Sequence, residues 1–460
     1  MLINKLDSVE VRPENGHKYA VRPIKKGDKV IKYGQVIGIA TEDIGVGGHV
    51  HSHNMRTSLE GKLEYTYNPE TYETVRAEGE LYFDGYVREN GDVGIRNDIW
   101  IINTVGCVNK IAEKLAALTG AKTFPHPFGC SQLGGDHKTT QLILRGMVNH
   151  PNAAGVLVLG LGCENNNIDE FRKVLGDVNE KRVKFLNCQD VSDEIEEGVK
   201  LINELKEYAS SFKRERLPVS MLKVGLKCGG SDGLSGITAN PLVGRFSDLL
   251  IAHGGSCVLT EVPEMFGAET ILMNRCRTET EFSKTVDLIN NFKKYFMRYG
   301  EKVDENPSPG NKAGGITTLE DKSLGCVQKG GTAPVEDVLD YAEAVKVKGL
   351  SLLKGPGNDL VASNALLASG AQLILFTTGR GTPFGCPVPT VKVSSNSDLA
   401  NKKRMWIDFN AGQLLEGKTF DELADEFLDY IIKLASGEIT THSERLDKHE
   451  LAIFKDGVTL

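Results

Sequence analysis

The chain has 460 residues, a formal net charge of −8 at pH 7 and 40% hydrophobic residues. This length is enough for two to four domains of about 100–200 residues each. No Lys/Arg block forms the basic patch that nucleic acid or an anionic membrane surface requires, so a small molecule is the expected partner.

The compartment is expected to be the cytoplasm. The opening MLINKLDSVEVRPENGHKYAV contains no apolar signal-peptide core, and no later segment reaches the ~18 uninterrupted apolar residues of a membrane span. The nine cysteines include no CxxC pair. Their odd number argues against a disulfide scaffold, so we expect reduced thiols.

Residues 1–70 are expected to form a small all-β module. The stretches YAVRPI, KVIKYGQVIGIAT and HVHSHN are short apolar or alternating runs without a helical period. GGHVHSHN carries three of the chain's 10 histidines, His49, His51 and His53, and an extended segment would project all three from one side. Because neutral imidazole is the commonest metal ligand, a divalent-metal site and a solvated polar turn both stay open.

A linker and two α/β domains are predicted next. Residues 71–84 are polar and aromatic with little periodicity, as expected of a linker. From residue 85 on, apolar runs such as DIWIINTVG and AAGVLVLGLG alternate with amphipathic helical patterns, which is typical of parallel strands buried on both faces. We predict an α/β protein in which the small N-terminal β-module is followed by an α/β domain at 85–215 and a larger one at 216–460, both with mainly parallel sheets.

Polar residues that follow the apolar strands are the first candidates for a site, because ligands bind at strand carboxyl ends in open α/β sheets. Cys163, Glu164 and three asparagines follow AAGVLVLGLG. An asparagine-capped turn is the competing interpretation. A thiol, a carboxylate and amides emerging together favour a site.

The stretch KCGGSDGLSGITANP is a candidate anion site that contains Lys227, Gly229, Gly230, Ser231 and Asp232. A Gly-Gly-Ser sequence that opens a helix presents backbone N–H groups and a positive dipole to a carboxylate or phosphate. The stretch matches neither Walker A nor GxGxxG, so it does not indicate a nucleotide.

Three carboxylates occur in EVPEMFGAE. Glu261 follows a strand directly, and paired carboxylates whose environments differ can divide into a base and an acid. We therefore favour a functional role for Glu261. Glu264 and Glu269 are interpreted as carboxylates that favour a helix dipole or solvent.

Two more stretches supply charged and titratable side chains. GYVRENGDVGIRND contains Arg88, Arg96 and Asn97, and FPHPFGCSQLGGDH contains His126 and His137 in a loop whose prolines oppose a helix. Arginine is the preferred bidentate partner of carboxylates. A surface salt bridge is the competing explanation, more for Arg88 than for Arg96.

The cysteines leave one metal alternative open. Three thiolates are able to hold an iron–sulfur cluster, but the sequence shows no clustered ligand run, so we favour a single divalent ion. Cys188, Cys257 and Cys276 are interpreted as small buried hydrophobes. The cysteines next to glycine at the ends of apolar runs are Cys107, Cys130, Cys163, Cys228 and Cys386.

These motifs together resemble the altronate and galactarate dehydratases, sugar-acid hydro-lyases with an N-terminal SAF-type β-module. The resemblance spans nearly the whole chain, through GGHVHSHN, GYVRENGDVGIRN, PFGCSQLGGDH, GLGCENNN, KCGGSDGLSGITANPLVG and TEVPEMFGAE in the expected order. It implies dehydration of a hexonate or aldarate, altronate first and galactarate next, to a 2-keto-3-deoxy acid. It also implies a divalent metal, with Fe²⁺ usual for the altronate enzymes and Mn²⁺ as the alternative.

Such a reaction requires a base for the C2 proton, an electrophile for the enediolate and an acid for the departing C3 hydroxyl. Our hypothesis is that His49, His51 and His53 bind the metal or substrate hydroxyls, with Asn54 beside them. Arg96 and the amides of Gly229, Gly230 and Ser231 hold the carboxylate, and Asn97 and Asp232 are further substrate contacts. The base and the acid come from five residues that we leave unranked: His126, His137, Glu164, Lys227 and Glu261.

Other functions stay open. A lyase of the same architecture that removes sulfite from sulfolactate is the first alternative, and a sugar-acid-binding protein without turnover is the second. A zinc hydrolase is disfavoured because no H-E-x-x-H occurs. A homodimer is expected on base rates alone.

Overall fold

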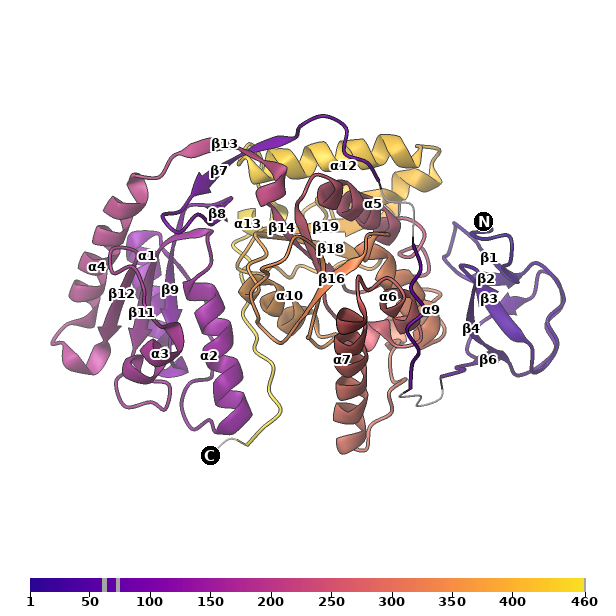
Figure 1. Cartoon of the computed structure of the whole chain (residues 1–460), viewed down its shortest axis with the longest axis horizontal. Helices are drawn as coiled ribbons and strands as arrows, with labels where there is room; N and C mark the ends of the chain where they lie inside the picture. The colour runs from indigo at the N-terminus through magenta and orange to yellow at the C-terminus, as the bar shows by residue number, and fades with distance from the viewer. Residues whose placement is uncertain (60–63, 72–74, 459–460) are drawn as a thin grey trace.

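The computed structural model of the chain describes residues 1–59, 64–71 and 75–458. A small β-module lies at one end of an elongated molecule, a large α/β domain in the middle and a smaller α/β domain at the other end (Figure 1). The predicted α/β class with an N-terminal all-β module is confirmed.

The N-terminal module consists of two small antiparallel sheets. Alternate residues such as Val9, Val11 and Val50 are buried between the sheets, as the alternating sequence predicts. One sheet has the order β1-β2-β5 and the other β3-β4-β6, with β1 at Val9–Val11, β2 at Lys18–Ala20, β3 at Lys29–Lys32, β4 at Gln35–Ala40, β5 at His49–Val50 and β6 at Met55–Arg56.

A buried ion triad attaches this module to the large domain. Asp321 accepts hydrogen bonds from Lys18 at 2.7 Å and from Lys32 at 3.0 Å, and all three side chains are almost fully buried. Burial acts to lower the pKa of Lys18, and despite the attraction of Asp321 it brings that pKa to about 8. For Asp321 the two ammonium groups outweigh burial and keep its pKa well below the usual range. The carboxylate is therefore the group that makes two buried cations tolerable.

The predicted linker is partly a strand. β7 (Tyr82–Val87) pairs antiparallel with β13 (Arg214–Pro218) and with β8 (Val93–Gly94). This three-stranded sheet joins the point where the chain enters the smaller α/β domain to the point where it leaves. Residues 72–74 of the predicted linker lie outside the described part of the chain.

The smaller α/β domain contains a four-stranded parallel sheet of order β10-β9-β11-β12. Alternate residues of β9 and β11 enter two different cores, Trp100 and Val156 on one face and Ile101 and Leu157 on the other. This explains why both strands read as continuous apolar runs. The strands are β9 (Asp98–Asn103), β10 (Lys122–Thr123), β11 (Ala153–Gly160) and β12 (Val183–Asn187), and the helices are α1 (Asn109–Thr119), α2 (Gly134–Val148), α3 (Ile168–Leu175) and α4 (Glu194–Ser210).

The large domain is built on a seven-stranded parallel sheet of order β16-β17-β15-β14-β18-β19-β20. Its strands are β14 (Lys223–Cys228), β15 (Ser256–Leu259), β16 (Val335–Leu339), β17 (Gly349–Leu353), β18 (Leu373–Thr378), β19 (Thr390–Ser394) and β20 (Phe409–Asn410). Its α-helices are α5 (Ala239–Ala252), α6 (Glu269–Met273), α7 (Glu279–Arg298), α8 (Pro309–Ala313), α9 (Leu319–Cys326), α10 (Asp359–Ala368), α11 (Ser397–Lys402), α12 (Phe420–Ala435) and α13 (His442–Arg445).

The two α/β domains contact each other closely. α2 packs against α10, and a Cβ on Gly146 would lie 2.6 Å from the Cα of Ala368, so the helix backbones approach directly at this point. The C-terminal segment returns to the smaller domain, where Lys455 Nζ donates to Thr140 Oγ1 at 2.6 Å. Figure 1 shows this segment running down between α2 and α7.

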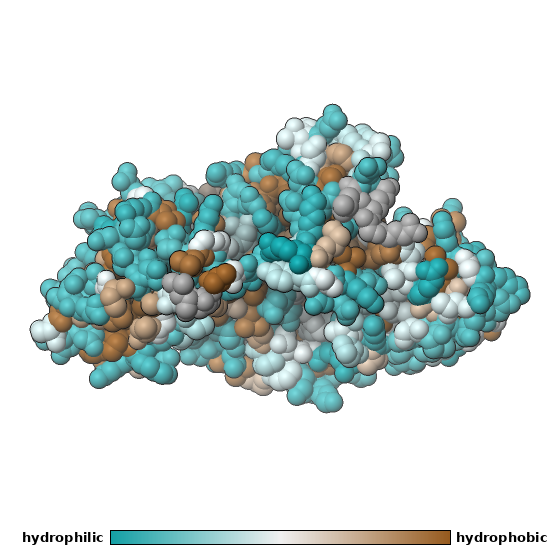
Figure 2. Space-filling view, turned by 90° about the horizontal axis from the view of Figure 1, so that it is seen from below, coloured by the Kyte–Doolittle hydropathy of each residue, from teal (hydrophilic) through white to brown (hydrophobic). Residues whose placement is uncertain are grey.

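The surface is mostly hydrophilic on the face shown in Figure 2. Hydrophobic residues gather there in small patches, several of them over the left part of the view, where the smaller α/β domain lies. Within the described ranges, no helix has the combination of length and apolar character that a membrane crossing needs.

Replacement of Asp321 by Asn tests the docking triad, because it leaves two buried ammonium groups without a counter-charge. We expect the free energy of unfolding to fall by about 3–5 kcal/mol, measured by urea unfolding. The matched control is Asp43→Asn, which removes the exposed partner of Lys25 in the same module and should change stability little, because water screens an exposed ion pair. Equal unfolding midpoints for the two variants would contradict an anchoring role of the triad.

Candidate active site

The large domain contains a buried cluster of charged and thiol side chains at the carboxyl ends of β14 and β15. Lys227 and Cys228 end β14, and Glu261 follows β15 with a left-handed backbone at φ 70°. Lys227 Nζ donates to Glu261 Oε1, and to Asp359 Oδ1 at 3.0 Å. The backbone N–H of Cys228 donates to Glu261 Oε2 at 3.1 Å. The parallel neighbours β14 and β15 thus bring Lys227 and Glu261, both predicted as site residues, into contact.

Glu264 belongs to the same cluster: it lies in the first turn of a 3-10 helix, as the helix-dipole interpretation expects, but it is buried and does not face solvent. Its Oε2 atom lies 3.2 Å from the Sγ atoms of both Cys228 and Cys326, and the two Sγ atoms are 3.4 Å apart. Within the described part of the chain, this is the one set of three His, Cys, Asp or Glu side chains whose ligand atoms all lie within 4.8 Å of one another. Glu269 is buried as well, at a helix start as predicted, but it is paired with Lys293 at 2.9 Å outside this cluster.

Three ammonium groups surround the carboxylates. Lys322 Nζ lies 2.8 Å from Glu264 Oε1, and Lys329 Nζ lies 3.4 Å from Glu261 Oε2. Burial would raise the pKa of Glu264, but Lys322 and the neighbouring lysines outweigh it and lower the pKa to about 2. Burial also acts to lower the pKa of Lys227, yet the Glu261 and Asp359 carboxylates hold it above its usual range. Lys227 is therefore cationic at neutral pH and suited to an electrophile or acid, not to a base.

Sequence reasoning missed Lys322, Cys326 and Lys329. All three come from DKSLGCVQKGG, where α9 is followed by a 3-10 helix at Val327–Gly330. Lys322 and Cys326 are four residues apart and share one face of α9. The one signal for these residues in the sequence was the Gly-Cys pair at the end of α9. It was overlooked because it follows a helix, and the search was restricted to residues that follow apolar strands.

The histidines of the β-module form a second cluster. Only His49 lies in a strand, and His51 and His53 lie in the turn that follows, so the segment is not extended over all three histidines. The rings still gather, because the His49 centroid is 5.4 Å from that of His51 and 5.6 Å from that of His53. His17, which the sequence analysis overlooked, joins through a hydrogen bond of 2.9 Å between its Nδ1 and His49 Nε2. Burial and then the neighbouring rings lower the pKa of His49 to about 4, so its imidazole is neutral at pH 7.

A chain of contacts connects this histidine cluster to the buried cluster. His51 Nε2 donates to the backbone oxygen of Lys312 in α8 at 2.9 Å. The adjacent Asn311 donates to Ser231 O at 2.8 Å and accepts from Lys322 Nζ at 3.3 Å. The helix α8 therefore lies between the β-module and the residues that surround Glu264.

The predicted anion loop lies beside this route, but it does not open a helix directly. A turn at residues 233–238 separates it from α5. The Gly229 N–H donates to Thr377 O at 3.0 Å, and Asp232 Oδ1 accepts from Ser235 N at 2.9 Å, so both are structural. The Ser231 hydroxyl is buried and has no hydrogen-bond partner in the described structure, which leaves it available to a ligand.

Arg96, Asn97 and Asn54 have structural partners in place of the predicted substrate. Arg96 makes two hydrogen bonds to the Glu444 carboxylate, at 2.7 and 3.1 Å, so the salt-bridge explanation that we favoured less applies to it. Asn97 accepts from Arg88 at 2.7 Å, and Asn54 donates to His49 O at 2.9 Å within the histidine turn. The hydrogen bonds of these three side chains are therefore made within the protein, where they stabilise the fold.

Arg380 is a cation that sequence reasoning missed. Its backbone N–H donates to Gly230 O at 2.9 Å, so its side chain begins at the predicted anion loop. The guanidinium is exposed and makes no ion pair or side-chain hydrogen bond within the described part of the chain. An unpaired guanidinium at this position is suited to bind a carboxylate.

The three remaining predicted catalytic residues lie in the smaller domain, away from β14 and β15. The Phe128 N–H donates to His126 Nδ1 at 3.2 Å, so Nε2 carries the proton and donates to Asn103 O at 2.8 Å. This leaves no lone pair of His126 for a substrate. Glu164 accepts hydrogen bonds from Thr104 at 2.6 Å and from backbone N–H groups, which outweigh burial and lower its pKa. His137 lies in α2 and not in the predicted loop, and its buried Nε2 has no partner in the described structure.

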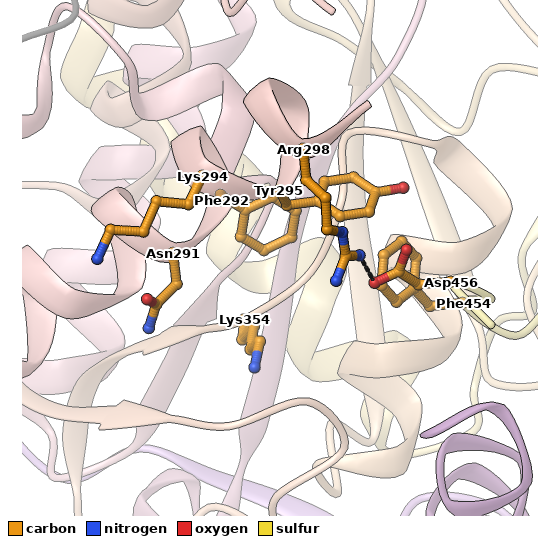
Figure 3. Close-up of a pocket in the computed structure, with 8 residues that line it drawn as sticks. All are labelled: Asn291, Phe292, Lys294, Tyr295, Arg298, Lys354, Phe454 and Asp456. Carbon is orange, nitrogen blue, oxygen red and sulfur yellow. Dashed lines mark hydrogen bonds and ion pairs between the residues drawn. The ribbon is translucent and has the colours of Figure 1, made fainter. Parts of the chain in front are cut away.

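The structure also has cavities away from the buried cluster. One of 320 Å³ is bounded by α7 and the C-terminal segment, and Figure 3 shows Arg298 paired with Asp456 at its edge and the Tyr295 ring nearby. A neighbouring cavity of 620 Å³ is lined by Phe128 and Gln132 of the smaller domain together with Tyr299. The loop that contains Cys130 thus borders this second cavity.

Comparisons with known proteins cover all three parts of the chain. Family models match at residues 6–58 (altronate/galactarate dehydratase SAF domain), 85–210 (D-galactarate dehydratase/altronate hydrolase, second domain) and 219–459 (D-galactarate/altronate dehydratase, C-terminal). The chain is 57% identical to an altronate dehydratase of Bacillus subtilis over 98% of its length and 94% of the relative. It is 54% identical to an altronate dehydratase of Escherichia coli (97% and 92% covered), and 30% identical to a galactarate dehydratase (L-threo-forming) of the same organism (98% and 91% covered).

His126 predicts a pH dependence of stability. Burial lowers its pKa from 6.5 to about 4, so the unfolded chain takes up the proton first as the pH falls. Stability is therefore lost between these two values, and His126 should account for about 2 kcal/mol between pH 7 and pH 5. The free energy of unfolding is measured with urea at pH 7 and at pH 5. Between these pH values, His126→Gln should lose about 2 kcal/mol less of this free energy than the wild type loses. The same pH dependence in both proteins would contradict the assignment.

Proposed function

The chain belongs to the D-galactarate/altronate dehydratase family, and we propose that it dehydrates altronate to a 2-keto-3-deoxy acid. It is a hydro-lyase that acts on a sugar acid. The choice of altronate over galactarate rests on identities of 57% and 54% to altronate dehydratases, against 30% to the galactarate enzyme. The structural observation that supports the reaction is the buried cluster of Lys227, Glu261, Glu264 and two thiols.

The thiol pair and Glu264 fit a divalent metal. Their ligand atoms already lie within 3.4 Å of one another, and the donor set of two sulfurs and one carboxylate suits iron better than manganese, which prefers oxygen ligands. We therefore propose Cys228, Glu264 and Cys326 as the Fe²⁺ ligands, in preference to the histidines. An ion bound there supplies Lewis acidity toward a hydroxyl or carboxylate oxygen.

Two of the predicted catalytic residues are positioned for proton transfer and charge stabilisation. Burial raises the pKa of Glu261, which makes its carboxylate a stronger base for a weakly acidic C2 proton. Lys227 contacts Glu261 and stays cationic, so it is suited to stabilise the negative charge of an enediolate. We propose Glu261 as the base and Lys227 as the electrophile.

The substrate carboxylate is assigned to Arg380 and the Ser231 hydroxyl, which replace Arg96 in this role. Arg380 is exposed at the Gly230 loop, and α8 connects Ser231 with the histidine cluster. The neutral imidazoles of His49 and His51 are then placed to contact the hydroxyl groups farther along the sugar chain. The homodimer and the cytoplasmic location stay predictions.

The substrate assignment is tested with an assay for 2-keto-3-deoxy acids on anaerobically purified protein containing Fe²⁺. The panel consists of D-altronate, galactarate, D-mannonate and sulfolactate, and sulfite is measured for the last. We expect product from D-altronate, and an increase in KM of at least about tenfold for Arg380→Ala, since loss of a charge-assisted hydrogen bond costs about 1.5–3 kcal/mol. Sulfite release would favour the sulfolactate reaction, and thermal stabilisation by sugar acids without product would favour a binding protein.

The metal assignment is tested by comparing two groups of variants. Cys228→Ser and Cys326→Ser should lose most of the bound Fe²⁺ on which activity depends, because serine is a much weaker ligand for this ion. His51→Ala should keep that iron and change KM. Cys257→Ser is the control, because Cys257 is buried in the same domain but lies outside the cluster. Loss of iron only in His51→Ala would transfer the site to the β-module.

A further inference from the structure

The smaller domain places a cysteine after the carboxyl end of each strand in its parallel sheet. Cys107 follows β9, Cys130 follows β10, Cys163 follows β11 and Cys188 follows β12. The Cys107, Cys130 and Cys163 thiols are exposed, and Cys188 is partly buried. Because parallel strands end at one edge, residues separated by more than 50 positions along the chain emerge on the same side of the domain.

The three loops with exposed thiols are joined directly to one another. The Gly106 N–H donates to Phe128 O at 2.9 Å, one residue before Cys107 and two before Cys130. The Asn166 N–H donates to Gly129 O at 3.0 Å, and the Ser131 N–H donates to Asn165 Oδ1 at 2.8 Å, on either side of Cys130. A Cβ on Gly129 would lie 2.0 Å from Thr104 O, so the loops touch through their backbones.

The backbone beside the thiols adopts conformations that need stabilisation by the surrounding structure. Ser131 has φ 55°, an uncommon value for a residue with a side chain, and Gly129 and Gly162 precede their cysteines with φ values of 102° and 129°. Glycine adopts such φ values readily, so the strained residue here is Ser131, and strain of this kind is often found at ligand sites.

Unsatisfied polar atoms gather at the same edge. Among the described residues, four buried oxygens there have no hydrogen-bond partner. They lie at the last residue of β9, β10 and β12 and in the loop after β11: Asn103 Oδ1, Thr123 Oγ1, Asn187 Oδ1 and Asn166 Oδ1. Buried acceptors of this kind cost free energy unless a ligand or water satisfies them. They are independent of the thiols and indicate a polar ligand.

We propose that Cys107, Cys130 and Cys163 hold an iron–sulfur cluster of the [4Fe–4S] type. Two sulfur ligands of one ion are at most about 4.6 Å apart, since metal–sulfur bonds are about 2.3 Å long. These three described thiols are not all within 4.8 Å of one another, so they suit a larger cluster better than a single ion. Three protein ligands leave one iron open to an oxygen ligand, at an edge where amide side chains lack partners. The fold thus brings the three cysteine-containing loops into contact, which the sequence alone does not show.

Cys188 is excluded as a fourth ligand by its surroundings. It packs against the apolar core beneath α1 and α4, and burial, followed by nearby carboxylates, raises its pKa to about 11. A thiol of this kind resists ionisation, and ligation requires the thiolate. Cys188 therefore provides a matched control on the same edge of the sheet.

The test uses the whole protein, reconstituted anaerobically with Fe²⁺, Fe³⁺ and sulfide and analysed for iron, acid-labile sulfide and the electron paramagnetic resonance signal after reduction. The wild type should bind sulfide and give a cluster signal, and Cys107→Ser, Cys130→Ser and Cys163→Ser should each lose both. Cys188→Ser should retain them. Cys228→Ser should also retain them while it loses the separate Fe²⁺, so failure of this inference and failure of the proposed function are distinguishable.

Alkylation of the wild type gives a second readout that needs no variant. In the apoprotein Cys107, Cys130 and Cys163 should react with iodoacetamide, and in the reconstituted protein all three should be protected until the cluster is removed by a chelator and an oxidant. Equal labelling in both states would overturn the inference. Protection with iron but without labile sulfide would overturn it too, because that pattern belongs to a mononuclear site.

Discussion

The direction of the strands is the constraint on which both functional regions depend. Every strand in the four-stranded and the seven-stranded sheet pairs in parallel, so each loop that follows one of these strands emerges at the same edge of its sheet. In the large domain this brings Lys227 to Glu261, and in the smaller one it brings together loops that contain Cys107, Cys130 and Cys163. Side chains distant in sequence therefore meet as a consequence of topology alone.

The buried cluster of the large domain is stable because its charges are balanced. Three ammonium groups, those of Lys227, Lys322 and Lys329, face the carboxylates of Glu261, Glu264 and Asp359. Isolated burial of any of these groups would cost several kcal/mol, so each depends on its partners. The Cys326 thiol also belongs to this cluster: its hydrogen bond with Cys228, followed by burial, raises its pKa. A divalent ion bound there would displace the Cys326 proton and add positive charge where carboxylates are available.

Sequence reasoning found what lies directly after an apolar strand and missed what helices bring to the same place. The strand pattern identified Lys227 and Glu261, and the structure places them in contact. Lys322 and Cys326 come from α9, whose position beside the 3-10 helix that contains Glu264 depends on tertiary packing that no local period records. Arg96 shows the opposite error, since its partner Glu444 is 348 positions away and nothing near Arg96 in the sequence reveals it. The α/β class was predictable because burial on both faces leaves continuous apolar runs.

The group that binds the substrate carboxylate can be inferred from which cationic side chains already have carboxylate partners within the protein. Arg96 is bound to Glu444, the three lysines of the buried cluster are paired with carboxylates, and the pKa values of His49 and His51 are lowered by burial. A sugar acid carries a carboxylate that needs a positive partner outside this balanced set. Arg380 meets that need because it begins at the Gly230 loop and its guanidinium is exposed without a partner in the described structure. We therefore propose that the loop after β18 recognises the charge, and that the neutral histidines of the β-module contact hydroxyl groups without adding charge.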